Sequence, residues 1–360
     1  MTPTTVLAVQ SVSCHLRQQP VLDWVTFSVR EQELICVLGP HDSGKTTLLQ
    51  AIAGLLPVTK GEIALVGERM STPMISVPAH QRPVGLVFQD YALFPHLTGQ
   101  ENLAFACPVP MTQEHKDAVQ EMLTLLGLTE CAARYPRDLS AKQQLRVALG
   151  RALLLLCKPR LLLLDAPFPA MDSQQRDRLI AEIRDLLKQR QIAAILATVS
   201  REEAFAWSDH VVLLHEGKVI QQSNPYELYY RPVQRAVADF LGNTNYLPIT
   251  VLSEHQWQSP MGDFHANYPL GFPIGSQCDW LVRPQEIALA LDPDGTALIE
   301  DRVFLGTSNV YRVRLAERVL TVQISNWFEP GQQVRISIRP DQPILFPALP
   351  LEPVAEENAS

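Results

Sequence analysis

The chain has 360 residues, a formal net charge of −8 and 46% hydrophobic residues. Its length predicts two or three domains, and its acidic balance argues against a basic nucleic-acid surface, so no nucleic-acid partner is expected. A membrane-spanning helix needs about 18 consecutive uncharged apolar residues, and no run in the sequence approaches that length. The first residues carry no signal-peptide pattern.

The cysteines show no spacing that would suit a metal site. Several of them lie within apolar runs, which is typical of buried free thiols in a reducing compartment. The six are Cys14, Cys36, Cys107, Cys131, Cys157 and Cys278.

The first predicted elements lead to a phosphate-binding loop. Residues 1–30 predict antiparallel strands, and the apolar run 34–38 predicts a buried strand. A G-x-x-x-x-G-K-[ST] pattern follows, and Thr47 opens a run with helical spacing. The loop consists of Gly39, Pro40, His41, Asp42, Ser43, Gly44, Lys45 and Thr46. Its backbone N–H groups bind nucleotide phosphates, with Lys45 reaching the β- and γ-phosphates and Thr46 holding Mg²⁺. A chance glycine-rich turn is the alternative, and the order strand, loop, helix argues against it.

An acidic strand end follows much later in the chain. Strands are predicted over 63–66 and 84–88, and helices over 112–127 and 140–157. Leu161–Leu164 then suit a central strand buried on both faces, and Asp165 ends it. An aspartate in this place holds Mg²⁺ in P-loop proteins. In isolation Asp165 would equally be a turn or capping residue, but the upstream P-loop favours the Mg²⁺ role.

The remaining pattern divides the chain in two. A helix is predicted over 174–189, strands over 192–198 and 211–215, and a hairpin turn at Glu216–Gly217. We expect a division at 241/242, because helical periodicity ends there. The strand-like runs beyond it are 279–282, 308–315, 319–322 and 334–338. The acidic tail 351–360 is predicted to be disordered.

These motifs, in this order, resemble the ATP-binding subunits of ABC transporters over nearly the whole chain. The resemblance implies that Gln89 is the Q-loop glutamine, that Asp165 closes the Walker B strand and that Asp172 ends the D-loop 169–172. It assigns the signature motif to Leu139, Ser140, Ala141, Lys142 and Gln143. It further implies ATP and Mg²⁺ as cofactors and an α/β, RecA-like P-loop core over 1–241, with a helical subdomain at about 90–158.

Residues 242–350 resemble the small all-β, OB-like domain of importer ATPases for iron(III), polyamines, sulfate, maltose and phosphonates. The runs Val282–Ile287 and Phe304–Thr307 carry this resemblance. A β-barrel without a ligand is the alternative, because an OB shape does not by itself imply binding.

Several residues depart from the family pattern at positions that carry its chemistry. Ala166 replaces the glutamate that polarises the attacking water, and Val199 replaces the switch histidine. Ala141 and Lys142 replace the two signature glycines, which permit close backbone approach to a phosphate. Asp42 stands where glycine is common. The aromatic residue that stacks on adenine falls near residues 14–16, where only His15 has a ring.

We therefore predict an ATP-binding subunit of an ABC importer that binds ATP and has weak or lost hydrolysis. The alternative is an inactive pseudo-ATPase that acts as a regulatory or scaffold subunit, and a decaying paralogue would show the same pattern. A soluble ABC protein of translation or DNA repair is an alternative class, but such proteins usually carry tandem cassettes or a long coiled coil, and the sequence shows neither. A P-loop kinase would need neither Gln89 nor the 139–143 segment.

The resemblance also implies partners and a location. These are a second ATP-binding subunit, identical or different, integral membrane permease subunits and, indirectly, a periplasmic or extracellular solute-binding protein. The chain would lie at the cytoplasmic face of the cell membrane. Importers recognise solute in other subunits, so only similarity favours iron(III), a polyamine or a phosphonate.

Overall fold

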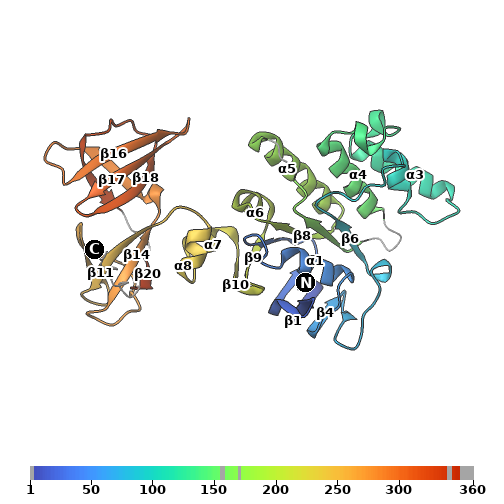
Figure 1. Cartoon of the computed structure of the whole chain (residues 1–360), viewed down its shortest axis with the longest axis horizontal. Helices are drawn as coiled ribbons and strands as arrows, with labels where there is room; N and C mark the ends of the chain where they lie inside the picture. Colours follow the sequence, from blue (N-terminus) through green and yellow to red (C-terminus); the bar gives the residue numbers. More distant parts are fainter. Residues whose placement is uncertain (1–3, 155–158, 169–171, 339–342, 349–360) are drawn as a thin grey trace, which may run out of the picture. The chain divides into compact units, whose positions relative to one another are not determined.

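The computed structural model describes residues 4–154, 159–168, 172–338 and 343–348. The chain separates into two compact units, Met1–Leu228 and Tyr229–Ser360 (Figure 1). Cys157 and the tail predicted to be disordered, 351–360, lie outside the described residues.

The first unit begins with an antiparallel sheet. Its strands are β1 (Thr5–Leu16), β2 (Gln19–Arg30), β4 (Lys60–Leu65) and β5 (Glu68–Ser71), in the order β2-β1-β4-β5. Two of them are the strands that the pattern of residues 1–30 predicts. The register between β1 and β2 shifts at several points, including Cys14/His15. Such bulges change which face each side chain occupies.

A second sheet forms the centre of this unit. Its strands are β3 (Leu34–Leu38), β6 (Val84–Val87), β7 (Leu161–Asp165), β8 (Ala193–Thr198), β9 (His210–His215) and β10 (Lys218–Ser223). The order is β10-β9-β3-β8-β7-β6, and all neighbours are parallel except β10 and β9. Every residue of β3, β7 and β8 is buried, as the apolar runs predict for central parallel strands. This confirms the α/β P-loop core.

Helix α1 (Lys45–Ala53) joins the two sheets. Its apolar residues Leu48, Leu49 and Ile52 belong to a core that also contains side chains of both sheets. The helix ends at Gly54, which adopts a left-handed conformation with φ 82°. Behind this end lies the buried guanidinium of Arg82, which donates hydrogen bonds to the carbonyl oxygens of Ala51 and Ile52.

A helical region follows β6, where the sequence predicts a helical subdomain. It contains α2 (Gly99–Ala104), α3 (Gln113–Leu125) and α4 (Ala141–Leu153). The single turns η2 (Thr129–Cys131) and η3 (Pro136–Asp138) lie between α3 and α4, whereas the single turn η1 (Ala79–Gln81) precedes β6. Capping boxes at Thr98, Thr112 and Ser140 start the three helices. They share a core of their own, which includes Leu103, Met122 and Val147. The helix predicted over 140–157 ends at Leu153.

The first unit closes with short elements around the central sheet. Helix α5 (Ser173–Gln189) matches its prediction, and α6 (Arg201–Trp207) was not expected. The predicted hairpin turn is confirmed at Glu216 and Gly217, whose φ values of 47° and 74° suit a turn with two left-handed residues. Helix α7 (Pro225–Tyr230) spans the boundary between the units, and α8 (Arg235–Phe240) belongs to the second unit.

The second unit contains two antiparallel sheets. One has the order β13-β12-β11-β14-β20 and comprises β11 (Asn245–Val251), β12 (Gln256–Ser259), β13 (Gly262–His265), β14 (Gln277–Val282) and β20 (Ile344–Pro347). The other has the order β15-β19-β16-β17-β18 and comprises β15 (Ile287–Leu291), β16 (Ala297–Phe304), β17 (Asn309–Leu315), β18 (Arg318–Ile324) and β19 (Gln333–Ile338). One core, with Trp257, Trp280 and Tyr311, joins both sheets, which confirms the all-β, OB-like prediction.

The boundary between the units falls earlier than the predicted 241/242. Arg283 is buried beside the single turn η4 (Pro284–Glu286) and donates hydrogen bonds to the carbonyl oxygens of Tyr229 and Ala238. The cluster of Ala238, Leu281 and Phe346 adds apolar contacts. Helix α8 therefore packs with the β domain. The sequence pattern within α8 gives no sign of this packing.

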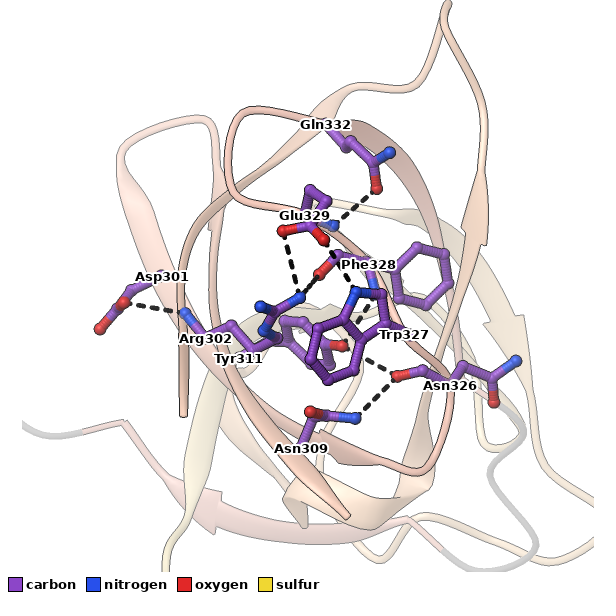
Figure 2. A network of polar contacts seen from close by, with 9 residues as sticks. All are labelled: Asp301, Arg302, Asn309, Tyr311, Asn326, Trp327, Phe328, Glu329 and Gln332. Carbon is purple, nitrogen blue, oxygen red and sulfur yellow. Dashed lines mark hydrogen bonds and ion pairs between the residues drawn. The ribbon is translucent and has the colours of Figure 1, made fainter. Parts of the chain in front are cut away.

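A polar network shapes the loop between β18 and β19 (Figure 2). The Tyr311 hydroxyl donates to the carbonyl oxygen of Asn326 at 2.8 Å and accepts from the N–H of Phe328 at 3.0 Å. The Arg302 guanidinium lies 3.5 Å from the ring centre of Trp327, and Glu329 accepts a hydrogen bond from the Trp327 indole at 2.8 Å. These contacts hold the exposed indole in one orientation.

Five cysteines are free and buried, as predicted: Cys14, Cys36, Cys107, Cys131 and Cys278. Within the described part of the chain, no helix has both the length and the apolar character needed to cross a membrane.

Candidate functional site

The predicted phosphate loop connects β3 to α1, and packing explains its glycines. Gly44 precedes α1 in a left-handed conformation, φ 99°, which favours glycine. A Cβ atom on Gly39 would lie 2.0 Å from the carbonyl oxygen of Leu214 in β9. Asp42 also adopts a left-handed conformation, φ 59°, which aspartate tolerates. The chain therefore forms the loop despite the missing third glycine.

Lys45 lies against the loop that precedes it. Its ammonium group donates hydrogen bonds to the carbonyl oxygens of Gly39 at 2.9 Å and Pro40 at 2.5 Å, and to the Ser43 hydroxyl at 3.2 Å. Burial lowers the pKa of Lys45, and the negative charge of Asp165 opposes that shift. The cation is thus held beside the loop's backbone N–H groups, where a polyanion would bind.

Thr46 and Asp165 bring the two motifs together. The Thr46 hydroxyl donates a hydrogen bond to Oδ1 of Asp165 at 3.1 Å, across the end of β7. Burial raises the pKa of Asp165, while the Thr46 hydrogen bond and the charge of Lys45 act in the opposite direction. A hydroxyl and a carboxylate oxygen next to a phosphate loop are the hard oxygen ligands that Mg²⁺ prefers, so these residues fit the predicted cation.

The cavity over this loop has a volume of about 620 Å³, within the range of about 300–1,000 Å³ that is typical of small-molecule and cofactor sites. Most of the predicted site residues line it: His41, Asp42, Gly44, Lys45, Thr46, Thr47, Gln89, Asp165, Ala166 and Val199. Gly39, Pro40 and Ser43 are absent from its lining and support the loop through the contacts described above.

Two departures from the family pattern form an apolar part of the wall. Ala166 directly follows Asp165, has φ 42° and donates its N–H to the carbonyl oxygen of Ala197 at 2.9 Å. Val199 follows β8 and is 43% exposed. A methyl and an isopropyl group offer no hydrogen-bond acceptor or donor. The places where the family has its water-polarising and phosphate-sensing residues are thus without polar side chains.

Glu203, in α6, lines the same cavity and was not among the predicted site residues. Its carboxylate accepts a hydrogen bond from the Thr198 hydroxyl at 2.5 Å, and burial raises its pKa against that bond. The contact fixes the segment that carries Val199. The pattern of a capping serine, Ser200, three residues before a glutamate was the available signal.

The segment after Gln89 connects the cavity to the helical region. The Tyr91 hydroxyl donates to the carbonyl oxygen of Pro167 at 3.0 Å, one residue beyond Ala166. Arg151, in α4, donates to the carbonyl oxygens of Tyr91 at 2.9 Å and Ala92 at 2.8 Å. The Q-loop segment therefore contacts both the β7 end and α4.

The signature segment begins α4 and does not line the cavity of its own chain. Leu139 is buried, and Ser140 and Gln143 form the capping box, with the Ser140 N–H 2.9 Å from Oε1 of Gln143. The helix proper starts at Ala141, and the Lys142 ammonium lies 3.6 Å from Glu182 in α5. The spacing in the sequence thus groups this segment with the other nucleotide-binding motifs, but the fold of a single chain does not place it in the same cavity as them.

Asp172 caps α5, because its carboxylate accepts the N–H of Gln175 at 2.9 Å. The other D-loop residues, 169–171, lie outside the described residues.

His15, the residue with a ring in the segment 14–16, makes its contact outside the cavity. Its Nδ1 lies 3.0 Å from the Thr59 hydroxyl, and its side chain does not line the cavity. Leu16 and Val21 line it instead, from the two strands of the β1–β2 hairpin. The register shift between Cys14 and His15 changes which side chain faces the loop.

A strand, a phosphate-binding loop and a helix, with an aspartate at the end of a neighbouring strand, define a P-loop nucleotide-binding protein. Comparison with known families narrows this class. Residues 22–169 match the ABC transporter family and residues 280–346 match the TOBE domain.

Two relatives are import proteins. The chain is 38% identical to the spermidine/putrescine import ATP-binding protein PotA 1 of Pseudomonas aeruginosa, covering 94% of this chain and 95% of the relative. It is also 38% identical to the Fe(3+) ions import ATP-binding protein FbpC of Streptomyces avermitilis, covering 84% and 86%. The chain belongs to this family: it is an import-type ATP-binding subunit of the ABC transporter family.

Solved structures agree in fold. A nucleotide-free ATP-binding cassette from an ABC transporter superposes with a TM-score of 0.58 at 19% identity, covering 66% of this chain and 99% of that one. A dimeric cassette bound to ADP and Pi gives a TM-score of 0.53 at 26% identity, covering 61% and 98%.

Proposed function

We propose that this chain binds MgATP in the cavity over the phosphate loop and serves an importer at the cytoplasmic face of the membrane, with greatly weakened hydrolysis. One observation carries the proposal. Lys45, Thr46 and Asp165 meet in one cavity whose catalytic positions hold Ala166 and Val199. The phosphate-binding groups are present, and the groups that would act on water are replaced by hydrocarbon.

Nucleotide binding is tested by titration calorimetry on the full chain. Lys45→Ala removes the cation beside the phosphates, and losing a charge-assisted contact of about 1.5–3 kcal/mol weakens binding by about 10- to 150-fold. Lys116→Ala is the matched control, because Lys116 is exposed on α3 and does not line the cavity. A folded wild-type chain that gives no heat at millimolar MgATP contradicts the proposal.

Hydrolysis is tested by steady-state turnover. Loss of a general base typically lowers a rate by about 10²–10⁴-fold, and Val199 removes a second polar group. We expect turnover far below one ATP per second. A purified chain that hydrolyses several ATP per second, with the Lys45→Ala variant silent, would refute this part.

A regulatory or scaffold role is the second candidate, and the position of the signature favours it. In the family, the signature of one subunit faces the phosphate loop of another. Here Ala141 and Lys142 stand at that helix start, and Lys142 is paired with Glu182. We propose that any hydrolysis in a complex with an intact partner occurs on the partner's phosphate loop. Replacing the loop lysine of each subunit separately tests this, since product trapped on this chain would contradict it.

For the permease we propose a groove of the helical region as the contact. It has a volume of about 500 Å³ and apolar walls that include Phe88, Phe94 and Phe105. Phe105 is 62% exposed and packs against Phe94, with ring centres 4.3 Å apart and the rings tilted by 47°. Phe88 immediately precedes Gln89, so a docked segment would contact the start of the Q-loop. Phe105→Asp should prevent co-purification with the permease and leave MgATP affinity unchanged; unchanged co-purification would exclude the groove.

We propose a polyamine or iron(III) as the imported solute, because the relatives above are named for spermidine/putrescine and for Fe(3+). Uptake of labelled putrescine and of ⁵⁵Fe in cells with and without the gene separates the two. Loss of neither uptake would refute both.

A further inference from the structure

The cavity over the phosphate loop has two chemically different ends. Lys45, Thr46 and Asp165 mark the end that takes phosphates and the cation. The β1–β2 hairpin provides the other end, through Leu16 and Val21. Val21 lies directly over the start of α1, because a Cβ atom on Gly44 would be 3.0 Å from the Val21 carbonyl oxygen and 3.6 Å from its Cγ1. A nucleotide anchored by its phosphates would therefore extend its base along this hairpin.

The hairpin end offers a base very little. Leu16 is 41% exposed and Val21 is partly buried, so both present aliphatic surface to the cavity. Neither side chain has a polar atom that could read the edge of a base, and neither has a ring on which a base could stack.

Two rings line the cavity, and both belong to its phosphate end. His41 lies in the phosphate loop, and Phe168 follows β7 and packs edge-on against Trp207, with ring centres 6.5 Å apart. Two further rings on the hairpin strands, His15 and Trp24, do not line the cavity. The His15 imidazole is held by Thr59. Trp24, on β2, is absent from the cavity lining, and the Lys60 ammonium lies 5.5 Å from its ring centre. The other polar residues of the cavity also belong to the phosphate end, because they lie in the phosphate loop, at the start of α1, just after β6, at the end of β8, and in α6 and its cap. They are Asp42, Thr47, Gln89, Thr198, Ser200 and Glu203.

We infer that this site selects its ligand by the triphosphate and Mg²⁺ and does not discriminate between bases, so that ATP, GTP and CTP bind about equally. The inference rests on the proposed nucleotide binding and adds its specificity. An aromatic platform typically contributes about 5- to 150-fold per base, and that contribution is missing at the hairpin end. Inorganic tripolyphosphate, which carries only the anchoring group, should therefore approach the affinity of the nucleotides.

The test is titration calorimetry on the full chain with Mg²⁺ and four ligands: ATP, GTP, CTP and tripolyphosphate. We expect the three nucleotides to agree within about threefold and tripolyphosphate to lie within about tenfold of them. Leu16→Tyr should raise nucleotide affinity about tenfold or more and leave tripolyphosphate unchanged. Leu55→Tyr, at an exposed leucine outside the cavity, is the matched control.

The outcomes are separable. ATP bound more than about tenfold tighter than GTP and CTP would overturn the inference and leave the proposed function standing. Equal nucleotide affinities with no gain in Leu16→Tyr would also overturn it, because the base would then lie elsewhere. If none of the four ligands binds to the folded chain, the proposed function itself is refuted and the inference with it.

Discussion

Replacing Arg82 by methionine should strongly destabilise the first unit. Arg82 is 2% exposed, and its guanidinium lies between the end of α1 and the strand β5. It donates five hydrogen bonds: to the carbonyl oxygens of Val77 (2.9 Å), Ala51 (3.2 Å), Ile52 (2.8 Å) and Met70 (3.1 Å), and to the Ser71 hydroxyl (2.7 Å). Arg82→Met keeps an unbranched stem and leaves these acceptors without their donor.

The magnitude follows from the contacts. Hydrogen bonds to a charged group contribute about 1.5–3 kcal/mol each, but these five are not additive, because burying the guanidinium has an opposing desolvation cost. Removing one partner of a buried charged network typically costs about 3–5 kcal/mol. For a unit of this size 1 kcal/mol shifts Tm by about 2–4 °C, so we expect a decrease of about 6–20 °C.

The assay is differential scanning calorimetry of the full chain, in which the transition of the first unit should move and that of the second should stay. Arg69→Met is the control, since Arg69 is largely exposed and pairs with Glu62 at 3.0 Å on the surface. Such a pair contributes about 0–1 kcal/mol. Equal shifts for the two variants would refute the reasoning.

Three further results are expected. Gly39→Ala forces a Cβ atom to within 2.0 Å of the Leu214 carbonyl oxygen, so stability should fall by about 1–3 kcal/mol and MgATP binding should be lost, as followed by circular dichroism and calorimetry. Since burial raises the pKa of Asp165, its carboxylate protonates at higher pH than an ordinary aspartate. The gain in ATP affinity from Mg²⁺ should then decline on acidification, while charging Asp165 as pH rises through its folded pKa lowers the stability of the free chain. Asp165→Asn should remove both dependences; a Mg²⁺ effect that persists in this variant would contradict the assignment. Finally, Ala166→Glu should raise turnover less than about tenfold. Val199 is unchanged in this variant, and the left-handed backbone at residue 166, φ 42°, determines where the new carboxylate points. Turnover of several ATP per second would show that Ala166 alone accounts for the weak hydrolysis.

The sequence predicts those parts of this fold that local pattern controls. The buried strands over 34–38 and 161–164 and the loop between strand and helix are continuous in the chain, and the structure has them within a residue or two. Helix α6, over 201–207, was missed because seven residues are too short for a periodic signal.

Contacts between distant residues explain the other differences. The unit boundary depends on Arg283 reaching Ala238, which no pattern near either residue reports. Whether His15 or Leu16 faces the cavity depends on a bulge in the β1–β2 pairing, because a shift of one residue changes the face of every side chain beyond it. The participation of Glu203 likewise requires the position of Thr198 in space.

Packing as well as nucleotide binding requires Gly39 and Gly44 of the phosphate loop, and packing also requires Gly217 of the β9–β10 turn. A Cβ atom on Gly39 would overlap Leu214, one on Gly217 would lie 2.2 Å from the Val21 carbonyl oxygen, and one on Gly44 would lie 2.8 Å from Leu22. Three chain segments interlock at these points with no room for a side chain. A descendant that no longer binds ATP would still need these glycines in order to fold, so their presence is evidence for the fold and not for ATP chemistry. Thr46 and Asp165, which line the cavity and contact each other, carry the predicted cation chemistry instead.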